Sequence, residues 1–222
     1  MEENGMRKVA QTLPGGYGLL PASTYFSHVS DPVATFDEEK YWSERYADAF
    51  GSTITSFPTL SNFLRDTAGL NADQGARNDL RTPLTLSKVL IDKAVATHAL
   101  LDSWVPPLGM TLTSIVGWGQ STVKGLAYSS ASKITCNEGV CANAPVLTHV
   151  PITTQDGDGT VISASARGNP DLPWRAWHFN AREYNKRELG NFYHQNLLAA
   201  APIQALIDEL IGWSIGSADD IM

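Results

Sequence analysis

The sequence has little cysteine, no run of basic residues and no long apolar stretch. Its 222 residues include 16 Lys and Arg against 23 Asp and Glu, for a formal net charge of −7. Because phosphate binding requires clustered positive charge, this balance argues against a nucleic-acid partner. A membrane-spanning helix needs about 18 apolar residues in succession. The most apolar window, 197–215, is interrupted by a proline and two acidic residues, so no transmembrane segment is predicted.

Cys136 and Cys141 are the only cysteines. A zinc site would need two further ligands at suitable spacing, and only His149 lies nearby, which argues against a metal. A local disulfide in a hairpin turn and two free thiols both remain open. The acidic N-terminus has no apolar run behind a basic start, so it does not resemble a signal peptide. The compartment is not predicted.

Apolar residues make up 43% of the chain and charged residues 18%, which is typical of a globular protein. The length favours a single domain over 1–222. Glycine and proline punctuate residues 1–30, for which an irregular segment is expected. A helical cap is expected over 31–108. Thr35 and Glu38 form a capping-box pattern, and aromatic residues then recur at Trp42, Tyr46 and Phe50.

Further helices are expected over 58–67 and from Thr82–Pro83 to the proline pair at 106–107, with a polar, mobile loop over 71–81 between them. The inward stripe of the longer helix would comprise Leu86, Val89, Leu90, Ala94, Leu101 and Trp104. The aromatic stripe that includes Tyr41 and Phe57 is expected to be core, with an acyl-binding or lipid-facing surface as the alternative.

After residue 108 the pattern changes from helical to extended. A buried strand is expected over 110–116, a hairpin with arms 124–130 and 145–153, and a further strand over 177–181. Apolar residues at helical spacing then predict a final helix over 202–212. Helices followed by strands and a last helix indicate an α/β fold, in which residues 109–222 form the end of the sheet.

The segment 155–161 (QDGDGTV) directly follows a predicted strand and admits three interpretations. The first interpretation is a tight turn, since Asp and Gly are favoured in turns. A calcium loop fits poorly, because with Asp156 as the first position the sixth and twelfth positions hold Val161 and Arg167, where Gly and Glu are required. The third interpretation is a catalytic acid, Asp158, at the end of a strand, which requires a histidine further along the chain.

His194 meets that requirement, because it precedes the final helix. The other histidines are not expected to be catalytic. His98 is expected to be a packed or surface residue of the long helix, His149 and His178 are expected in strands, and His28 has no obvious partner.

The order of these motifs resembles the C-terminal part of the lecithin:cholesterol acyltransferase and lysosomal phospholipase-like branch of the α/β-hydrolases. The resemblance rests on 12–21 (TLPGGYGLLP), 114–122 (SIVGWGQST), 157–161 (GDGTV) and 194–198 (HQNLL), and it spans about Thr12 to Ile211. It implies a helical cap, or lid, inserted before the last strands, Asp158 as the triad acid and His194 as the general base. It implies neither an organic cofactor nor a metal.

The chain departs from this family at the nucleophile. A G-x-S-x-G elbow should precede the acid, and none does. The segment 212–216 (GWSIG) matches literally, but Ser214 follows a helix and comes after both Asp158 and His194, whereas the fold runs serine, acid, histidine. We expect it to be a helix end fraying into the tail. Without the elbow and an oxyanion hole the chain alone should have no useful hydrolase activity.

The sequence therefore predicts the cap and C-terminal catalytic half of a serine hydrolase or acyltransferase acting on a lipid or other ester. A missing N-terminal half or a partner chain would supply the serine and cover an otherwise open, apolar sheet edge. The alternative is a non-catalytic remnant that serves as a binding or interaction module.

Overall fold

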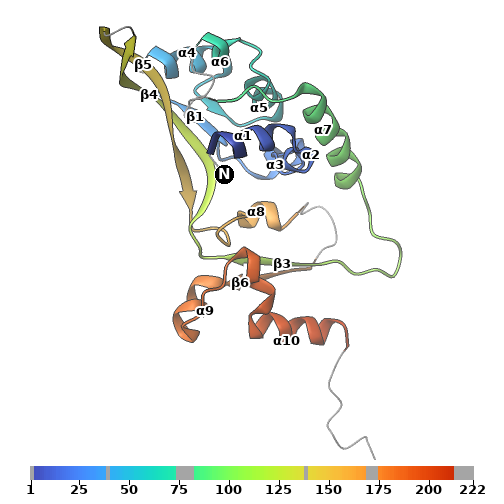
Figure 1. The fold of residues 1–222 in the computed structure, drawn as a ribbon. Coiled ribbons are helices and arrows are strands. Elements are labelled where there is room, and N and C mark those ends of the chain that lie inside the picture. Colours follow the sequence, from blue (N-terminus) through green and yellow to red (C-terminus); the bar gives the residue numbers. More distant parts are fainter. Residues whose placement is uncertain (1–2, 39–40, 74–82, 138–139, 169–174, 213–222) are drawn as a thin grey trace, which may run out of the picture. The chain divides into compact units, whose positions relative to one another are not determined.

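The computed structural model of the chain describes residues 3–38, 41–73, 83–137, 140–168 and 175–212 (Figure 1). Its contacts divide it into two compact units: unit 1 spans 1–108 and 124–152, and unit 2 spans 109–123 and 153–222. Both contain helices and strands, so the protein is of mixed α/β class, which is compatible with the predicted fold class. The break at 108/109 falls where the predicted cap ends, but the hairpin belongs to unit 1 rather than to the predicted core.

The sheet of unit 1 has the strand order β2-β1-β4-β5. Its strands are β1 (Ala34–Phe36), β2 (Thr53–Ile54), β4 (Thr122–Asn137) and β5 (Val140–Thr154). Strand β1 pairs antiparallel with β2 and parallel with β4, so the sheet is mixed. Strands β4 and β5 are the predicted hairpin, and both arms are longer than expected. Cys141 in β5 is disulfide-bonded.

In the described part of unit 1, seven helices accompany this sheet. They are α1 (Glu3–Thr12), α2 (Pro14–Tyr17), α3 (Ser23–His28), α4 (Tyr41–Phe50), α5 (Phe57–Leu64), α6 (Leu70–Asp73) and α7 (Lys88–Asp102). Figure 1 shows α1 to α3 near the N-terminus and α7 as the longest of them. Helix α5 confirms the predicted short helix.

Aromatic side chains form the centre of the unit 1 core. Phe36 stacks on Tyr128 of β4 and on Tyr46 of α4 at centroid distances of 5.2 and 5.6 Å. Phe63 meets these rings edge-on, an arrangement that adds to the free energy gained from burial. Trp42, Tyr46 and Phe50 of α4 are all buried, so three members of the aromatic stripe predicted as core are core, whereas Phe57 is only partly buried. Tyr41 is exposed.

Two expectations for the first forty residues are wrong. Residues 1–30 are not irregular: their glycines and prolines lie between short helices or at a first turn, as Pro14 does in α2, where proline is tolerated. Thr35 does not cap α4. It lies within β1, where it pairs with Thr53 and Ala127.

Helix α7 also begins later than predicted and buries a different face. Ser87 is its N-cap, with a side chain that accepts a hydrogen bond from the backbone N–H of Leu90. Ile91 is its only fully buried residue, and Val89, Leu101 and Trp104 of the predicted stripe are exposed. Residues 74–82, which include most of the predicted polar loop and Thr82, lie outside the described residues.

Unit 2 is built on two parallel strands, β3 (Thr113–Trp118) and β6 (Arg175–Asn180). They pair in register from Thr113↔Arg175 to Trp118↔Asn180. Both match predicted strands to within a few residues. Trp118 and Trp177 are more than a third exposed. Among the described residues each strand has the other as its only sheet partner, and a parallel pair of this kind normally lies inside a larger, covered sheet.

The described residues of unit 2 also form four helical elements: α8 (Ser163–Ala166), α9 (Ala181–Glu188), a 3₁₀ helix (His194–Ala199) and α10 (Ala201–Leu210). Ala181, Leu197, Ala200 and Ile203 form its buried core. Helix α10 confirms the predicted final helix, although only Ile203 is fully buried on it. Helices α8 and α9 were not predicted.

Candidate functional site

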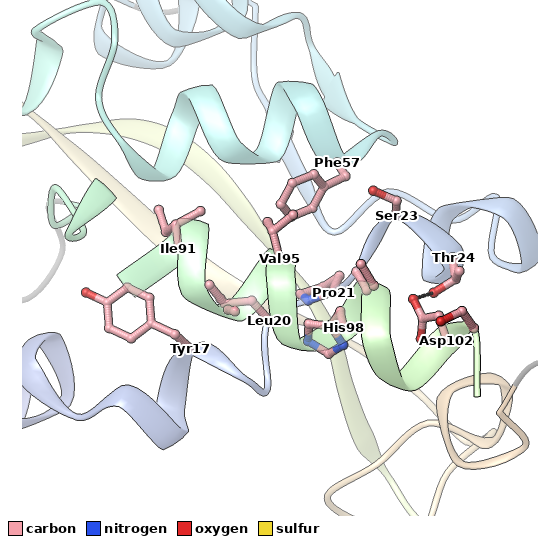
Figure 2. Close-up of a pocket in the computed structure, with 14 residues that line it drawn as sticks. Tyr17, Leu20, Pro21, Ser23, Thr24, Phe57, Ile91, Val95, His98 and Asp102 are labelled. Atoms are coloured by element: carbon pink, nitrogen blue, oxygen red, sulfur yellow. Dashed lines mark hydrogen bonds between the residues drawn. The ribbon is translucent and has the colours of Figure 1, made fainter. Parts of the chain in front are cut away.

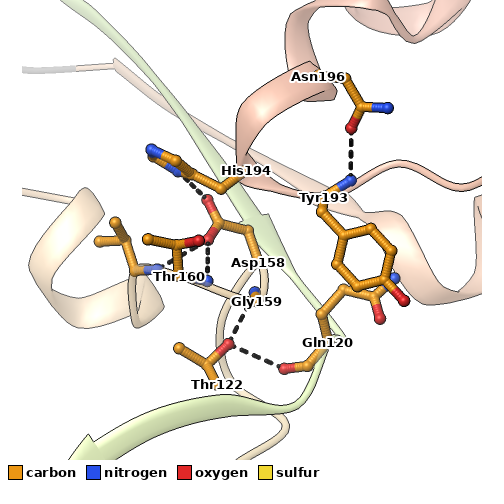
Figure 3. Close-up of polar contacts among 9 residues, drawn as sticks. Gln120, Thr122, Asp158, Gly159, Thr160, Tyr193, His194 and Asn196 are labelled. Atoms are coloured by element: carbon orange, nitrogen blue, oxygen red, sulfur yellow. Dashed lines mark hydrogen bonds and ion pairs between the residues drawn. The ribbon is translucent and has the colours of Figure 1, made fainter. Parts of the chain in front are cut away.

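Unit 2 carries a compact polar site where the segment after β5 meets the extension of β3 (Figure 3). The backbone N–H groups of Gly119 and Gln120 donate to the carbonyls of Gln155 and Gly157, at 2.9 Å each. A bridge between Gln120 and Asp158 follows directly. These contacts fix the 155–161 loop just beyond the carboxyl end of β3.

Backbone hydrogen bonds hold the carboxylate of Asp158 in place. Its Oδ1 accepts from the N–H groups of Thr160 and Val161 at 3.1 and 2.8 Å. Its own N–H donates to the carbonyl of Val161 at 3.2 Å. The loop is therefore a tight turn as well as the site of an acid, since Asp side chains commonly bond the backbone two or three residues ahead.

Gly159 and Thr122 make this turn possible. Gly159 has φ of +98°, and a Cβ there would lie 2.8 Å from Tyr193 Cδ1, so only glycine fits without strain. Its N–H donates to Oγ1 of Thr122 at 2.9 Å. The Thr122 hydroxyl donates in turn to the carbonyl of Gln120 at 3.0 Å. Thr122 is fully buried, and it ties the acid loop to the strand extension.

His194 is the first residue of the 3₁₀ helix. Its backbone N–H donates to the carbonyl of Asp158 at 3.0 Å. The helix start is capped by Asn196, whose Oδ1 accepts from the Tyr193 N–H at 2.8 Å. Leu197 anchors the helix in the unit 2 core. These contacts fix the backbone at His194 and so determine where its imidazole lies.

The two predicted residues meet: Nδ1 of His194 lies 2.8 Å from Oδ2 of Asp158. An ionised carboxylate only accepts hydrogen bonds, so Nδ1 is the donor in this contact when Asp158 is ionised. In a neutral ring with that tautomer, the opposite nitrogen, Nε2, carries the lone pair. The Asp158 side chain is 5% exposed and that of His194 is 50% exposed. A buried acid thus holds a histidine that a reactant can reach.

Gly117 of β3 permits Asp158 and Leu197 to pack closely against the strand. A Cβ at Gly117 would lie 2.8 Å from both the Cβ of Asp158 and a methyl of Leu197. Glycine in a strand often marks such a close approach, which is the signal by which Gly117 could have been found in the sequence. Thr122 gives no comparable local signal.

The other candidates lie elsewhere or outside the described residues. His149 packs against Tyr128 in the sheet of unit 1, and His178 is an exposed residue of β6; both are strand residues, as predicted. Ser214 lies outside the described residues. Within the described parts of the chain, no cluster of three or more His, Cys, Asp and Glu could hold a metal.

Among the described residues, no helix has both the length and the apolarity to cross a membrane. No model of a known protein family matches the chain, and neither a curated protein nor a solved structure matches it. Any functional conclusion therefore depends on the motifs and on the geometry of the site.

Proposed function

We propose that the chain supplies the acid and the general base of a serine hydrolase or acyltransferase that acts on a lipid or other ester. The observation that carries this proposal is the hydrogen bond between Nδ1 of His194 and the buried carboxylate of Asp158. The resemblance to the lecithin:cholesterol acyltransferase and lysosomal phospholipase-like branch supports it through the order of the motifs.

In this mechanism Nε2 of His194 takes the proton of an attacking hydroxyl as that oxygen bonds to the ester carbonyl carbon. The Asp158 carboxylate holds the ring in the required tautomer and stabilises the imidazolium that forms. The imidazolium then gives the proton to the departing alkoxide, and the alcohol leaves. Asp158 and His194 handle the proton in both steps, and the attacking hydroxyl is supplied from elsewhere.

The serine itself has to come from another segment or chain. No G-x-S-x-G elbow precedes Asp158 in the sequence. Strands β3 and β6 have one sheet partner each among the described residues, and an unpaired strand edge is a template for a further strand. We propose that an N-terminal half or a partner chain pairs there and brings the serine to Nε2 of His194.

A binding or interaction module is the second candidate. It is favoured by the apolar side chains that α7 and the segment after it expose, which are Val89, Leu100, Leu101, Trp104, Val105 and Leu108. Exposed apolar patches on a globular unit commonly mark an interaction surface. This function would need no histidine chemistry.

Hydrolysis of p-nitrophenyl butyrate by the purified chain distinguishes the two. A positioned base accelerates attack by water on this activated ester, so we expect a slow rate above the buffer background. His194→Gln should remove at least about nine tenths of that excess rate, since positioned acid–base groups contribute about 10²–10⁴-fold. His178→Gln, which removes an exposed histidine of the same unit, is the matched control and should leave the rate unchanged. Equal excess rates in both variants would favour the binding module.

Labelling with a fluorophosphonate tests where the serine is. Such probes mark activated serines, and the intact mass of the chain reports the adduct. We expect no adduct on the purified chain. A stoichiometric adduct would show that the chain holds its own nucleophile, and Ser214→Ala would be the first variant to map it.

A further inference from the structure

The loop that leads to His194 has no regular secondary structure. It spans residues 189–193, between α9 and the 3₁₀ helix, and both Asn191 and Tyr193 are exposed. Loops of this kind are usually more mobile than the helices and strands they connect. A catalytic group, in contrast, has to be held within roughly 0.5 Å of its working position. The contacts that fix this loop therefore decide whether His194 can act as a base.

Asn185 of α9 fixes the loop at Phe192. Its Oδ1 accepts from the Phe192 N–H at 2.8 Å, and its Nδ2 donates to the Phe192 carbonyl at 3.0 Å. One side-chain amide thus bonds both polar backbone groups of a single residue, as a residue of a neighbouring strand would. An amide presents a donor and an acceptor side by side, which neither a carboxylate nor an apolar side chain can do. The chemistry of asparagine therefore matches what this position requires.

Phe192 is also attached through its ring and through the acid loop. The ring meets Tyr184 of α9 edge-on at a centroid distance of 5.3 Å, and both rings pack against the buried core of unit 2. The side chain of Gln120 donates to the Phe192 carbonyl at 3.4 Å. The backbone N–H of Gln120 donates to the Gly157 carbonyl of the acid loop at 2.9 Å. Phe192 is therefore the point where α9, the core and the acid loop all contact the loop that precedes the histidine.

Asn196 completes the attachment of the loop. Its Oδ1 accepts from the Tyr193 N–H at 2.8 Å (Figure 3), and its Nδ2 donates to the Asn191 carbonyl at 2.9 Å. Its own N–H donates to the Tyr193 carbonyl, and the His194 N–H donates to the Asp158 carbonyl, at 3.0 Å each. Every polar backbone group from the Asn191 carbonyl to the His194 N–H is thus bonded within unit 2, in an exposed loop where water could have served instead.

We propose that Asn185 is a positioning residue for His194, whose amide holds the loop so that the imidazole stays on the Asp158 carboxylate. Asn185 bonds the backbone of Phe192, two residues before the base, and acts through it. Without that amide the loop gains freedom, and Nδ1 of His194 leaves its 2.8 Å contact with Asp158 for part of the time. A displacement of about 1 Å caused far from the chemistry can lower a rate about 10²-fold. The inference rests on the proposed function, in which His194 is the general base.

The tautomer of His194 in Asn185→Leu tests the proposal, with ¹⁵N NMR of the imidazole of the full chain as the readout. Leucine has the branching of asparagine without its polar atoms, so this variant removes both bonds to Phe192. We expect the Nδ1–H population to fall, the Phe192 amide to exchange faster, and the excess rate on p-nitrophenyl butyrate to drop about tenfold or more. Asn185→Asp keeps the acceptor for the Phe192 N–H and loses the donor. It should act in the same direction, and it replaces Asn185→Leu if that variant does not fold.

Two control variants remove hydrogen bonds elsewhere. Asn180 caps α9 by accepting from the Glu183 N–H at 2.9 Å, so Asn180→Ala weakens the same helix but leaves the bonds to Phe192 in place. Thr24→Ala deletes a bond of unit 1, in which Thr24 donates to Asp102 beside an apolar cavity (Figure 2). Both variants should keep the tautomer of the unaltered chain.

The tautomer is measured without an ester, so its outcome is separate from that of the hydrolysis assay. A lower Nδ1–H population in Asn185→Leu than in Asn180→Ala supports the positioning role. A population that Asn185→Leu leaves unchanged, or that Asn180→Ala lowers as far, overturns it. An unaltered chain with no excess hydrolysis refutes the proposed function, and the tautomer then still decides whether Asn185 holds the imidazole on Asp158.

Discussion

Removal of the Asp158 side chain should destabilise unit 2 far more than removal of a neighbouring aspartate. Asp158→Ala deletes three hydrogen bonds, from the backbone N–H groups of Thr160 and Val161 and from the His194 ring. Hydrogen bonds to charged groups contribute about 1.5–3 kcal/mol each when buried. His194 is half exposed and Thr160 is exposed, so water replaces part of what is lost. We expect a net loss of about 3 kcal/mol.

Asp156→Ala is the matched control. Asp156 lies in the same loop but is exposed, so its substitution should change stability by less than about 0.5 kcal/mol. Because the chain forms two compact units, a single unfolding transition need not report on both. Amide hydrogen exchange of β3 and β6 measures the stability of unit 2 itself. Equal changes in the two variants would refute the view that Asp158 organises the loop.

Three further predictions concern other parts of the fold. Gly117→Ala should destabilise unit 2 by about 1–3 kcal/mol, since its Cβ would meet Asp158 and Leu197 at 2.8 Å; amide hydrogen exchange of β3 and β6 measures the loss. Burial raises the pKa of Tyr128 from 10.0 to about 12. The neutral phenol therefore contributes up to about 2.7 kcal/mol to the free energy of unfolding. This contribution is complete below pH 10 and is lost as the pH rises through 12. Tyr128→Phe should reduce that alkaline loss in pH-dependent unfolding. Ser56→Ala removes the N-cap of α5 and should lower the melting temperature through a loss of about 1 kcal/mol.

Each of these three has its own control or contradicting result. Gly15→Ala adds the same methyl group where nothing lies within 4 Å, so a loss as large as that of Gly117→Ala would contradict the close approach. Tyr41→Phe removes an exposed phenol and should leave the alkaline loss as in the unaltered chain. For α5, an unchanged melting temperature in Ser56→Ala would show that the cap contributes nothing.

The pairing of the candidate site was predictable because it depends on chain order. An acid in a Gly-flanked turn after a strand, followed by a histidine before the last helix, fixes which residues can meet. The structure brings Asp158 and His194 within 2.8 Å. The contacts that hold them were not predictable, because Thr122 lies far from the loop in sequence and becomes its partner only through the fold.

The fold was predicted best where the local sequence pattern alone determines the secondary structure. The extended pattern located β3 and β6, and the helical pattern located α10, to within a few residues. The same approach failed at Thr35, whose capping pattern was overridden by strand pairing with Ala127, a residue distant in the sequence. It failed again on α7, where apolar residues such as Leu100 and Leu101 lie on several sides, so that composition alone did not identify the buried face.

The ring nitrogen that carries the proton on His194 tests the central claim most directly. ¹⁵N NMR of the imidazole, at a pH where the ring is neutral, identifies the tautomer. With Asp158 present we expect the Nδ1–H form, which leaves Nε2 free to act as the base. Asp158→Asn should shift the population towards Nε2–H, because an amide can donate to Nδ1. A ring that is already Nε2–H in the unaltered chain, or a population that Asp158→Asn leaves unchanged, would contradict the account.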